Sequence, residues 1–432
     1  MRKLSIEMQL NNPKNTTINN FEINIFIFLS IIFPLIDTLN GFFITIGASI
    51  PIGQAYRLIF VLFMVLGILT HSLPKTRFTF FVGTFIVGNI FLLILQAIIL
   101  QNPLSLVISD LNSLVKYFLW ILIAYFCYQR KQELSEIDVS FYFRIINSLF
   151  ILCLLVPFVL GIGTYTYKAS AAGFKGYFYA QNDLSCVFIV LITLSCSEFL
   201  KEIKIKWTWR LLVSTLVFIG DLTCLLLIGM KTGIVYALLI LIFLMILLLF
   251  SDDYYSVENR GFTIVGCLLF SLLLIFKGIG TATTMLSQTW IRITYFYHLY
   301  DGDLVRLITS SRSEYLKASF EKFIYGPHSI FTLFFGQGPA YRIEKFGRLG
   351  LSEMDFFDLF FNYGLIGILL FLMIINYVLK ESCKRNKNPI YSFIFILILI
   401  YSFFAGHVLY SAISATIFGL IIGCVLLNNT NE

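Results

Sequence analysis

Charge is what this sequence has least of: only 13% of its 432 residues are Asp, Glu, Lys or Arg. Soluble domains carry about 25% charged residues, and a chain that is 58% hydrophobic and 17% aromatic falls outside their range. Apolar runs of about 20 residues, the length that spans a bilayer, recur along the whole chain. The composition therefore predicts an all-α integral membrane protein with many spans.

Other absences narrow this interpretation further. The sequence has no CxxC or His-rich spacing, and its eight cysteines lie in or beside apolar runs, so we expect neither a disulfide framework nor a metal site. No small-residue cleavage site follows the first apolar run, which predicts an uncleaved first span. Most of the net charge of +7 sits in short loops between spans, so it does not indicate a nucleic-acid partner.

The apolar runs divide the chain into about twelve predicted transmembrane helices, with no evident internal repeat. Residues 1–20 form a polar tail that we expect to be cytoplasmic, and its low-complexity stretch NNPKNTTINN (11–20) is expected to be disordered. Helices one to nine occupy 21–277, a large loop occupies 278–354, and helices ten to twelve with the C-terminus occupy 355–432. The predicted spans lie near 22–42, 53–70, 78–100, 110–128, 141–161, 183–200, 209–228, 232–250, 261–279, 356–379, 389–405 and 407–427.

The orientation of the bundle follows from the Lys and Arg residues of the short loops. Under a twelve-span count, the bases of the N-terminal tail and of the loops after spans two, four, six and ten all fall on one side. Both termini are then cytoplasmic, and the 278–354 loop is extracytoplasmic. That loop holds nine basic residues if Lys277 is included, against the usual bias. This indicates either a bound anion or a solvated loop face.

Within the large loop, residues 310–324 predict an amphipathic helix. Ser311 and Glu314 fit a capping box at its start. Arg312 falls in the first turn, where the helix dipole disfavours a cation, so its presence needs another reason. It either joins the free N–H groups of the helix start in a phosphate site or meets lipid headgroups. The apolar positions have helical spacing: Leu316, Phe320, Phe323 and Ile324.

Several ionisable residues lie within or at the edges of predicted spans, mostly toward the outer half. Such groups generally face a bundle interior or a watery cavity and mark function. Asp37 has the alternative of a structural ion pair with Lys116 or Arg57. Lys231, in GMKTG between spans seven and eight, is either a ligand for an anion or a lysine that snorkels to the interface. The ionisable residues within or at the edges of predicted spans are Asp37, Arg57, Lys116, Asp183 and Asp221.

An acidic stretch, SEMDFFDLFFNYGLIG (352–367), opens the tenth predicted span. A cap and dipole role would explain Asp355. It would not explain Asp358 and Asn362, which share a helix face with Asp355 at i+3 and i+7. These residues therefore predict an interior polar stripe that opens outward, and a carboxylate there, Glu353 included, can act as a general base toward a hydroxyl.

Four local stretches, taken in their order and spacing, resemble the Wzy-type O-antigen and capsule polymerases and the wider superfamily that these share with O-antigen ligases. They are FKGYFYAQND (174–183), IGMKTGI (228–234), SSRSEYLKASF (310–320) with FGQG (335–338), and SEMDFFDLFFNYGLIG (352–367). The resemblance covers most of the chain, including the large loop before the last three spans. It implies a GT-C-like fold. It also implies polymerisation of undecaprenyl-pyrophosphate-linked oligosaccharide at the outer face of the bacterial cytoplasmic membrane.

The resemblance also implies roles for individual residues. Lys231 and Arg312 would bind the pyrophosphate, with Arg57 and Lys175 as further cations. The ligases carry a His where this sequence has Glu353. That departure favours a polymerase over a ligase and leaves the base between Glu353 and Asp355. GMKTG lacks the Arg that some relatives have, which weakens the expectation of a bidentate grip on phosphate.

The expected reaction is an inverting, metal-independent glycosyl transfer without a cofactor. Cations hold the charge that develops on the leaving diphosphate, while a carboxylate takes the proton of the incoming hydroxyl. Asp358 would orient a cation or a sugar hydroxyl. The acids of DGD (301–303) leave a rival in which Mg²⁺ or Mn²⁺ holds the diphosphate. The predicted sugar contacts are Tyr179, Asn182 and Asn362.

The expected partners are the lipid-linked oligosaccharide and membrane lipid, with a flippase and a chain-length regulator as candidates and no nucleic acid. A ligase, which differs only in its acceptor, is one alternative. A transporter of lipid-linked oligosaccharide is the other, and it would place its sites near the midplane in broken helices related by a repeat. The polar residues concentrate instead at the outer rim, which favours the polymerase.

Overall fold

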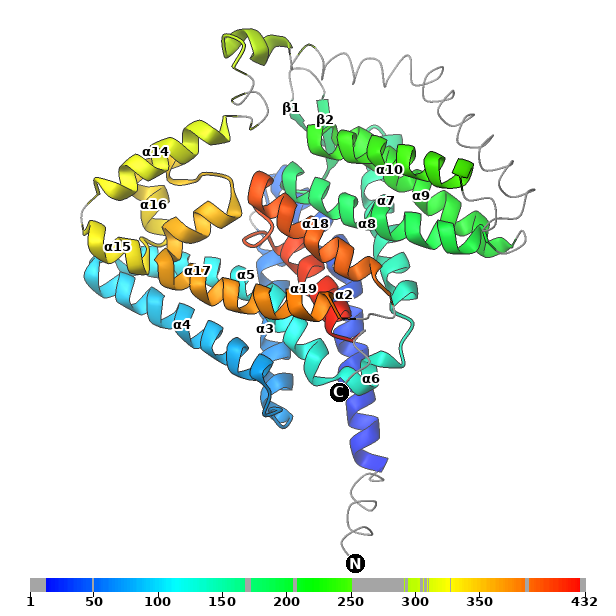
Figure 1. The fold of residues 1–432 in the computed structure, drawn as a ribbon, viewed down its shortest axis with the longest axis horizontal. Coiled ribbons are helices and arrows are strands. Elements are labelled where there is room, and N and C mark those ends of the chain that lie inside the picture. Colours follow the sequence, from blue (N-terminus) through cyan, green and yellow to red (C-terminus); the bar gives the residue numbers. More distant parts are fainter. Residues whose placement is uncertain are drawn as a thin grey trace, which may run out of the picture.

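The computed structural model describes residues 13–48, 50–167, 172–204, 208–250, 291, 294–303, 306, 309, 311–326, 328–384 and 388–427. Helices make up nearly all of this part of the chain (Figure 1). The strands β1 (Thr164–Tyr167) and β2 (Ala172–Gly176) form a short antiparallel hairpin between two of the helices.

The described residues include nine helices that are long and apolar enough to cross a membrane and two shorter apolar helices. The protein is therefore an all-α, multi-pass membrane protein, as the composition predicted. The predicted ninth span, 261–279, lies outside the described residues, so the total of twelve stays a prediction. The helices are α2 (Pro13–Thr45), α3 (Ile52–Thr70), α4 (Arg77–Ile99), α5 (Leu104–Gln129), α7 (Val139–Val159), α8 (Gln181–Glu202), α9 (Trp209–Ile228), α10 (Lys231–Phe250), α17 (Asp355–Ser382), and the shorter α18 (Ile390–Ala405) and α19 (Ala412–Leu427).

Three helix starts differ from the sequence-based boundaries by five residues or more. One is that of α19, which begins at Ala412 rather than at 407, because residues 406–411 are not helical. Helix α2 begins at Pro13, so residues 13–20 are helical and the prediction of a disordered tail is wrong for them. Proline is well placed there, because the first turn of a helix needs no N–H from it. Helix α5 begins at Leu104 rather than near 110. Its polar Asp110 is tolerated because the carboxylate accepts a hydrogen bond from the Ala340 N–H at 2.7 Å.

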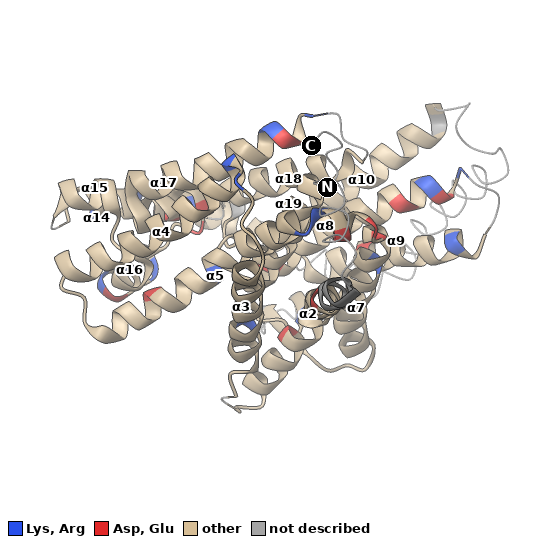
Figure 2. Ribbon diagram, turned by 90° about the horizontal axis from the view of Figure 1, so that it is seen from below, with Lys and Arg blue, Asp and Glu red and all other residues tan. Residues whose placement is uncertain are grey.

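Charged residues are sparse on the helices of the bundle (Figure 2). Two groups of charged contacts lie near opposite ends of α2 and α3. Near the start of the first span, Glu22 lies 2.8 Å from Arg130, at the end of α5, and 3.8 Å from His71, just after α3. We call this the Glu22 end. Near the other ends of α2 and α3, Asp37 pairs with Arg57. We call this the Asp37 end.

Small residues bring the central helices into close contact. A Cβ atom at Gly419 of α19 would lie 2.7 Å from the Trp120 carbonyl oxygen of α5, and one at Gly423 would lie 2.9 Å from the Cys127 sulfur. Helices in a membrane gain stability from such close backbone approach, since lipid gives them little hydrophobic drive to associate. The pairing of α5 and α19 therefore fixes the middle of the bundle.

A buried polar cluster joins α7, α8 and α9. Asp221, which is fully buried, accepts hydrogen bonds from the side chains of Asn147 at 2.8 Å and Ser195 at 2.5 Å. Asp221 thus connects its helix to two others within the bundle. Since it does not line the cavity described below, its position favours a structural role.

The described part of the large loop is folded rather than extended. Helices α14 (Arg312–Ile324), α15 (Ser329–Phe335) and α16 (Pro339–Phe346) and the 3₁₀ turn η1 (Gly347–Gly350) pack on one side of the molecule, near α4, α5 and α17 (Figure 1). The predicted amphipathic helix is confirmed as α14. Its predicted capping box is wrong, because Ser311 has a left-handed backbone (φ 66°) and its hydroxyl donates to the Tyr300 hydroxyl at 2.7 Å.

Helix α17 is broken at Gly364, where the backbone is left-handed (φ 67°). Gly336 of the FGQG stretch lies against this break. A Cβ at Gly336 would be 2.3 Å from the Asn362 carbonyl oxygen, and a Cβ at Gly364 would be 2.4 Å from that of Phe334. The Gln96 side chain of α4 donates to the Asn362 carbonyl at 2.8 Å. These glycines therefore let the loop backbone enter the bundle beside a broken helix.

Candidate functional site

A cavity of about 680 Å³ opens among polar side chains at the Asp37 end of the bundle. Its walls come from α2, α3, α5, the start of α8 and the turn between α18 and α19. We call it the polar cavity. It is lined by Asp37, Asn40, Ile44, Ala48, Ile50, Pro51, Gln54, Arg57, Lys116, Tyr179, Ala180, Asp183, His407, Tyr410, Ser411, Ala412 and Ile413.

Arg57 and Asp37 form an ion pair on one wall of the polar cavity. The pair joins α2 to α3, and the Asn40 side chain adds a hydrogen bond from the Gly53 N–H at 3.0 Å. The sequence left Asp37 with two candidate partners, and the structure selects Arg57. Arg57 lines the cavity while its charge is balanced by Asp37, so a bound anion would have to share it.

Lys116 and Asp183 bring α5 and α8 to the same cavity. Lys116 is partly buried, and the charges of Arg57 and Asp183 both act on it. Asp183 is only 7% exposed, and its Oδ1 atom has no hydrogen-bond partner among the described residues. His407 and Ser411 lie beside its carboxylate. A carboxylate with a vacant acceptor therefore faces a cavity that also holds cations.

Asp355 anchors the turn that carries His407. Its Oδ1 atom accepts the His407 N–H at 2.6 Å, and its Oδ2 atom accepts the Val408 N–H at 2.7 Å and the Ser402 hydroxyl at 2.9 Å. Asp355 is buried, and it does not line the polar cavity. The Asp355 carboxylate therefore accepts N–H groups of this turn, and it does not cap its own helix, α17. These contacts favour a structural role over that of the predicted base.

Glu353 and Arg312 lie next to the same turn. Arg312 Nε is 3.7 Å from a Glu353 carboxylate oxygen, and its Nη1 atom donates to the Phe404 carbonyl at 3.4 Å. Glu353 has a left-handed backbone (φ 57°), and a Cβ at Gly406 would lie 2.3 Å from its carbonyl oxygen. The structure therefore brings together Arg312, the predicted phosphate ligand, and Glu353, a predicted base. Glu353 lies against Gly406, the residue that precedes His407.

The other predicted ligands surround the start of α8. Lys231 is the first residue of α10, and Tyr401 of α18 lies beside the start of α10. The Tyr401 hydroxyl also donates to the Asn182 carbonyl at 3.0 Å. Lys175 donates to the Tyr179 carbonyl at 2.7 Å, and Tyr179 is exposed at the cavity. Tyr401 also lies near enough to Arg312 for the charge of the arginine to act on it.

Asp358 and Asn362, the deeper residues of the polar stripe on α17, bind an arginine of the large loop. Arg342 of α16 is 2% exposed and donates to Asn362 Oδ1 at 2.8 Å and to Asp358 Oδ1 at 3.4 Å. Burial lowers the pKa of Arg342, and the charge of Asp358 opposes that shift. Asp358 also accepts the Ser352 N–H at 2.8 Å. The polar stripe therefore serves to hold the loop on α17, which favours structural roles for Asp358 and Asn362.

No motif in the sequence marks Arg342 or His407 as a functional residue. Arg342 resembles the other bases of the loop, and His407 follows an apolar span without any motif. The sequence places Asp37, Lys116 and Asp183 within or at the edges of spans, but only the folded chain shows that they share a cavity.

Of the two acids of DGD (301–303), Asp303 has another contact. Asp303 of DGD accepts the Arg306 N–H at 3.1 Å, as a turn residue does. Within the described ranges, no group of three or more His, Cys, Asp or Glu side chains is arranged to hold a metal ion.

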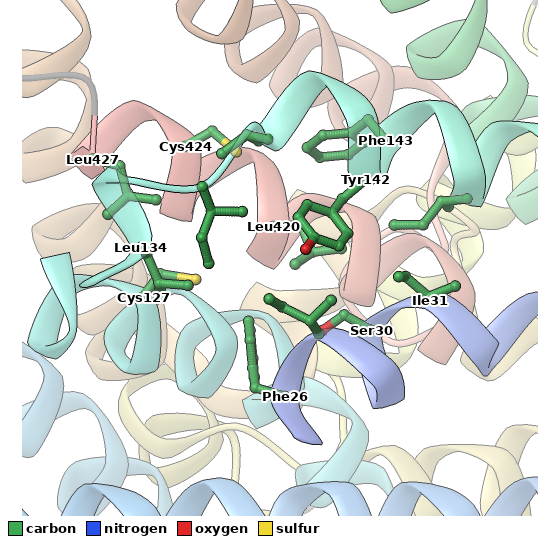
Figure 3. A pocket seen from close by; sticks show the side chains of 14 residues that line it. Phe26, Ser30, Ile31, Cys127, Leu134, Tyr142, Phe143, Leu420, Cys424 and Leu427 are labelled. Carbon is green, nitrogen blue, oxygen red and sulfur yellow. The ribbon is translucent and has the colours of Figure 1, made fainter. Parts of the chain in front are cut away.

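A second, much smaller cavity lies toward the Glu22 end. It has a volume of about 70 Å³, and Figure 3 shows its lining of apolar side chains together with Ser30 and Tyr142. Neither charged residues nor histidines line it. Of these two cavities, only the polar cavity has groups that can bind an anion or move a proton.

No known protein family model matches this sequence, and no curated protein matches it. The chemistry of the site therefore comes from its own residues. Lys116 and Arg57 can balance negative charge, Asp183 can accept a proton, and Tyr179 can stack on a sugar ring.

Proposed function

We propose that this protein is an inverting glycosyltransferase that polymerises undecaprenyl-pyrophosphate-linked oligosaccharide repeat units into O-antigen or capsular polysaccharide. One observation carries the proposal: a polar cavity, lined by charged groups from distant parts of the chain, opens at one end of an apolar bundle. Ionisable groups are costly within a membrane and mark substrate sites there. The resemblance of four sequence stretches to the Wzy-type polymerases supports the choice of substrate.

The proposal places the Asp37 end at the outer face of the cytoplasmic membrane. The short loops near the Glu22 end hold Lys75 and Arg130, and Lys201 lies in the last turn of α8. Bases in short loops and at helix ends beside them favour the cytoplasmic side. Both termini are then cytoplasmic. The polar cavity faces the side on which lipid-linked repeat units are polymerised.

In the proposed reaction, a sugar hydroxyl of one repeat unit attacks C1 of the sugar that is bonded to pyrophosphate on another. The C1–O bond to phosphate breaks, and its electron pair leaves with the diphosphate. Arg312 and Lys231 balance the charge that develops there, since fixed cations stabilise such a leaving group. Arg57, which lines the cavity, and Lys175, which donates to the carbonyl of the lining residue Tyr179, are further cations. Attack opposite the leaving group inverts the configuration at C1.

The test uses the full-length protein in proteoliposomes that contain a defined lipid-linked repeat unit. A ladder of lengthening oligosaccharide on a gel is the expected product. A single transfer to an added acceptor lipid would indicate a ligase instead. Movement of the substrate across the vesicle membrane with no new glycosidic bond would indicate a transporter, and either result would overturn the polymerase assignment.

A further inference from the structure

We infer that Asp183 is the base of this reaction, and that the acceptor sugar therefore binds in the polar cavity. The inference rests on the proposed function and names the group that takes the proton from the acceptor hydroxyl. It moves this role from the acidic stretch at the start of α17 to the first turn of α8.

A comparison of the acids near the Asp37 end supports this choice. Asp355 accepts four hydrogen bonds from the α18–α19 segment. Asp358 is held by Arg342, and Asp37 is paired with Arg57. Glu353 faces Arg312 at 3.7 Å. Each of these carboxylates already has a donor or a cation as its partner, and only Asp37 among them lines the polar cavity.

Asp183 has the Ser411 hydroxyl as a donor, but it differs from these acids in its other oxygen atom. It lines the cavity, is 7% exposed, and has an oxygen atom, Oδ1, without a hydrogen-bond partner in the part of the chain that the structure describes. A buried acceptor without a partner is destabilising unless something donates to it. An acceptor hydroxyl in the cavity would supply that donor, in the geometry that a general base requires.

Burial opposes the charged form of Asp183, and several of the groups around it favour that form. Lys116 and His407 line the same cavity and interact electrostatically with Asp183, and Ser411 lies beside it. Asp183 also belongs to the first turn of α8, where the helix dipole favours an anion. Asp37 and Asp355 act in the opposite sense as like charges.

The chemical step balances with these groups alone. The acceptor oxygen forms the new bond to C1 of the donor sugar while its proton passes to an Asp183 carboxylate oxygen. The bond between C1 and the phosphate oxygen breaks, and the diphosphate leaves with the electron pair. The proton on Asp183 then returns to solvent through the cavity.

Asp183→Asn is the central test, because the amide keeps the shape of the side chain and removes its basicity. Turnover should fall by roughly 10²–10⁴-fold, as for loss of a general base, while the KM for the lipid-linked donor stays unchanged. Asp183→Ala should regain turnover when formate is added, because the small carboxylate can occupy the vacated space. Chloride at the same ionic strength should give no such recovery.

Asp221→Asn is the matched control, since it makes the same change at a buried Asp that does not line the cavity. It should retain wild-type turnover. Normal turnover in Asp183→Asn, a raised donor KM as its main effect, failure of Asp183→Asn to fold in a thermal unfolding assay, or no recovery of Asp183→Ala with formate would each overturn the inference. If the wild-type protein makes polymer in the same assay, the proposed function stands even when Asp183 is not the base.

Discussion

At the scale of single residues, the structure separates charges that hold the fold from charges that remain available at the site. Asp355 and Asp358 are buried and hydrogen-bonded to backbone or to Arg342. Among the residues that the structure describes, Arg312 has one carboxylate near it, at 3.7 Å, and one weak hydrogen bond to a carbonyl. It is therefore the cation of the loop best placed to exchange its present contacts for a diphosphate.

Arg312→Ala should abolish polymer formation while the protein level stays near normal. Arg312→Lys should restore it only in part, because a point charge cannot replace the planar fork of a guanidinium. Arg348→Ala is the matched control: Arg348 is 76% exposed and lies 4.0 Å from the same Glu353 carboxylate. Polymer length on gels measures all three variants. Full-length polymer from Arg312→Ala would show that this arginine does not bind the donor.

Glu353→Gln tests one of the two acids that the sequence analysis left as candidates for the base. Because Glu353 faces Arg312 and lies outside the lining of the polar cavity, we expect turnover within about tenfold of wild type, against roughly 10²–10⁴-fold for a lost base. Steady-state kinetics with varied donor concentration separates turnover from donor KM. A loss of turnover as large as that of a general base, with unchanged KM, would return this role to Glu353.

At the scale of elements, two glycines decide how the loop meets the bundle. The break of α17 at Gly364 and the left-handed backbone of Gly336 (φ 77°) place two backbone segments in direct contact. The Gln96 side chain donates to carbonyls of both segments, at 2.5 Å to Phe335 and 2.8 Å to Asn362. A continuous helix at this point would leave no room for the loop.

Gly336→Ala should destabilise the protein by about 1–3 kcal/mol, because alanine is strained in a left-handed backbone and its Cβ would lie 2.3 Å from the Asn362 carbonyl oxygen. Gly83→Ala is the control, since a Cβ there meets nothing within 4 Å on α4. That change should be neutral or stabilise the helix by up to about 1 kcal/mol. Thermal unfolding in detergent compares the two. Equal unfolding temperatures would show that the glycine contact is not needed.

At the scale of the whole molecule, the charged contacts define two ends. Glu22, His71 and Arg130 meet at one end, and Asp37, Arg57 and Asp183 line or border the cavity at the other. The proposed function requires the second end to face outward.

Single cysteines tested with a membrane-impermeant maleimide on intact cells should report this orientation. Tyr325→Cys, at a position that is 86% exposed, should react from outside, whereas Lys384→Cys should react only after the membrane is opened. Cys383 is first replaced by Ser, because it is exposed while the other six cysteines in the described ranges are buried. Reaction of Tyr325→Cys only in opened cells would overturn both the orientation and the proposed mechanism.

The membrane class and most helix boundaries could be predicted from the sequence because they depend on local properties. A run of about 20 apolar residues is helical wherever it lies in a bilayer, since its backbone must satisfy its own hydrogen bonds there. The span predicted at 209–228 coincides with α9, and the helix predicted at 310–324 is α14. The predicted sites of charge near the outer rim followed from the same local pattern.

The partners of those charges depended on the tertiary structure. Asp358 and Asn362 lie on one helix face, as their spacing predicted, but only the fold brings Arg342 to them from another helix. In the same way, Asp183 and His407 are separated by most of the chain and line one cavity. The strength of a charge–charge or hydrogen-bonding contact depends on distance and burial, and neither is encoded in the local sequence. The sequence by itself therefore determined where the helices and charges lie along the chain, whereas the packing of the helices decided which charges hold the fold and which remain open to a ligand.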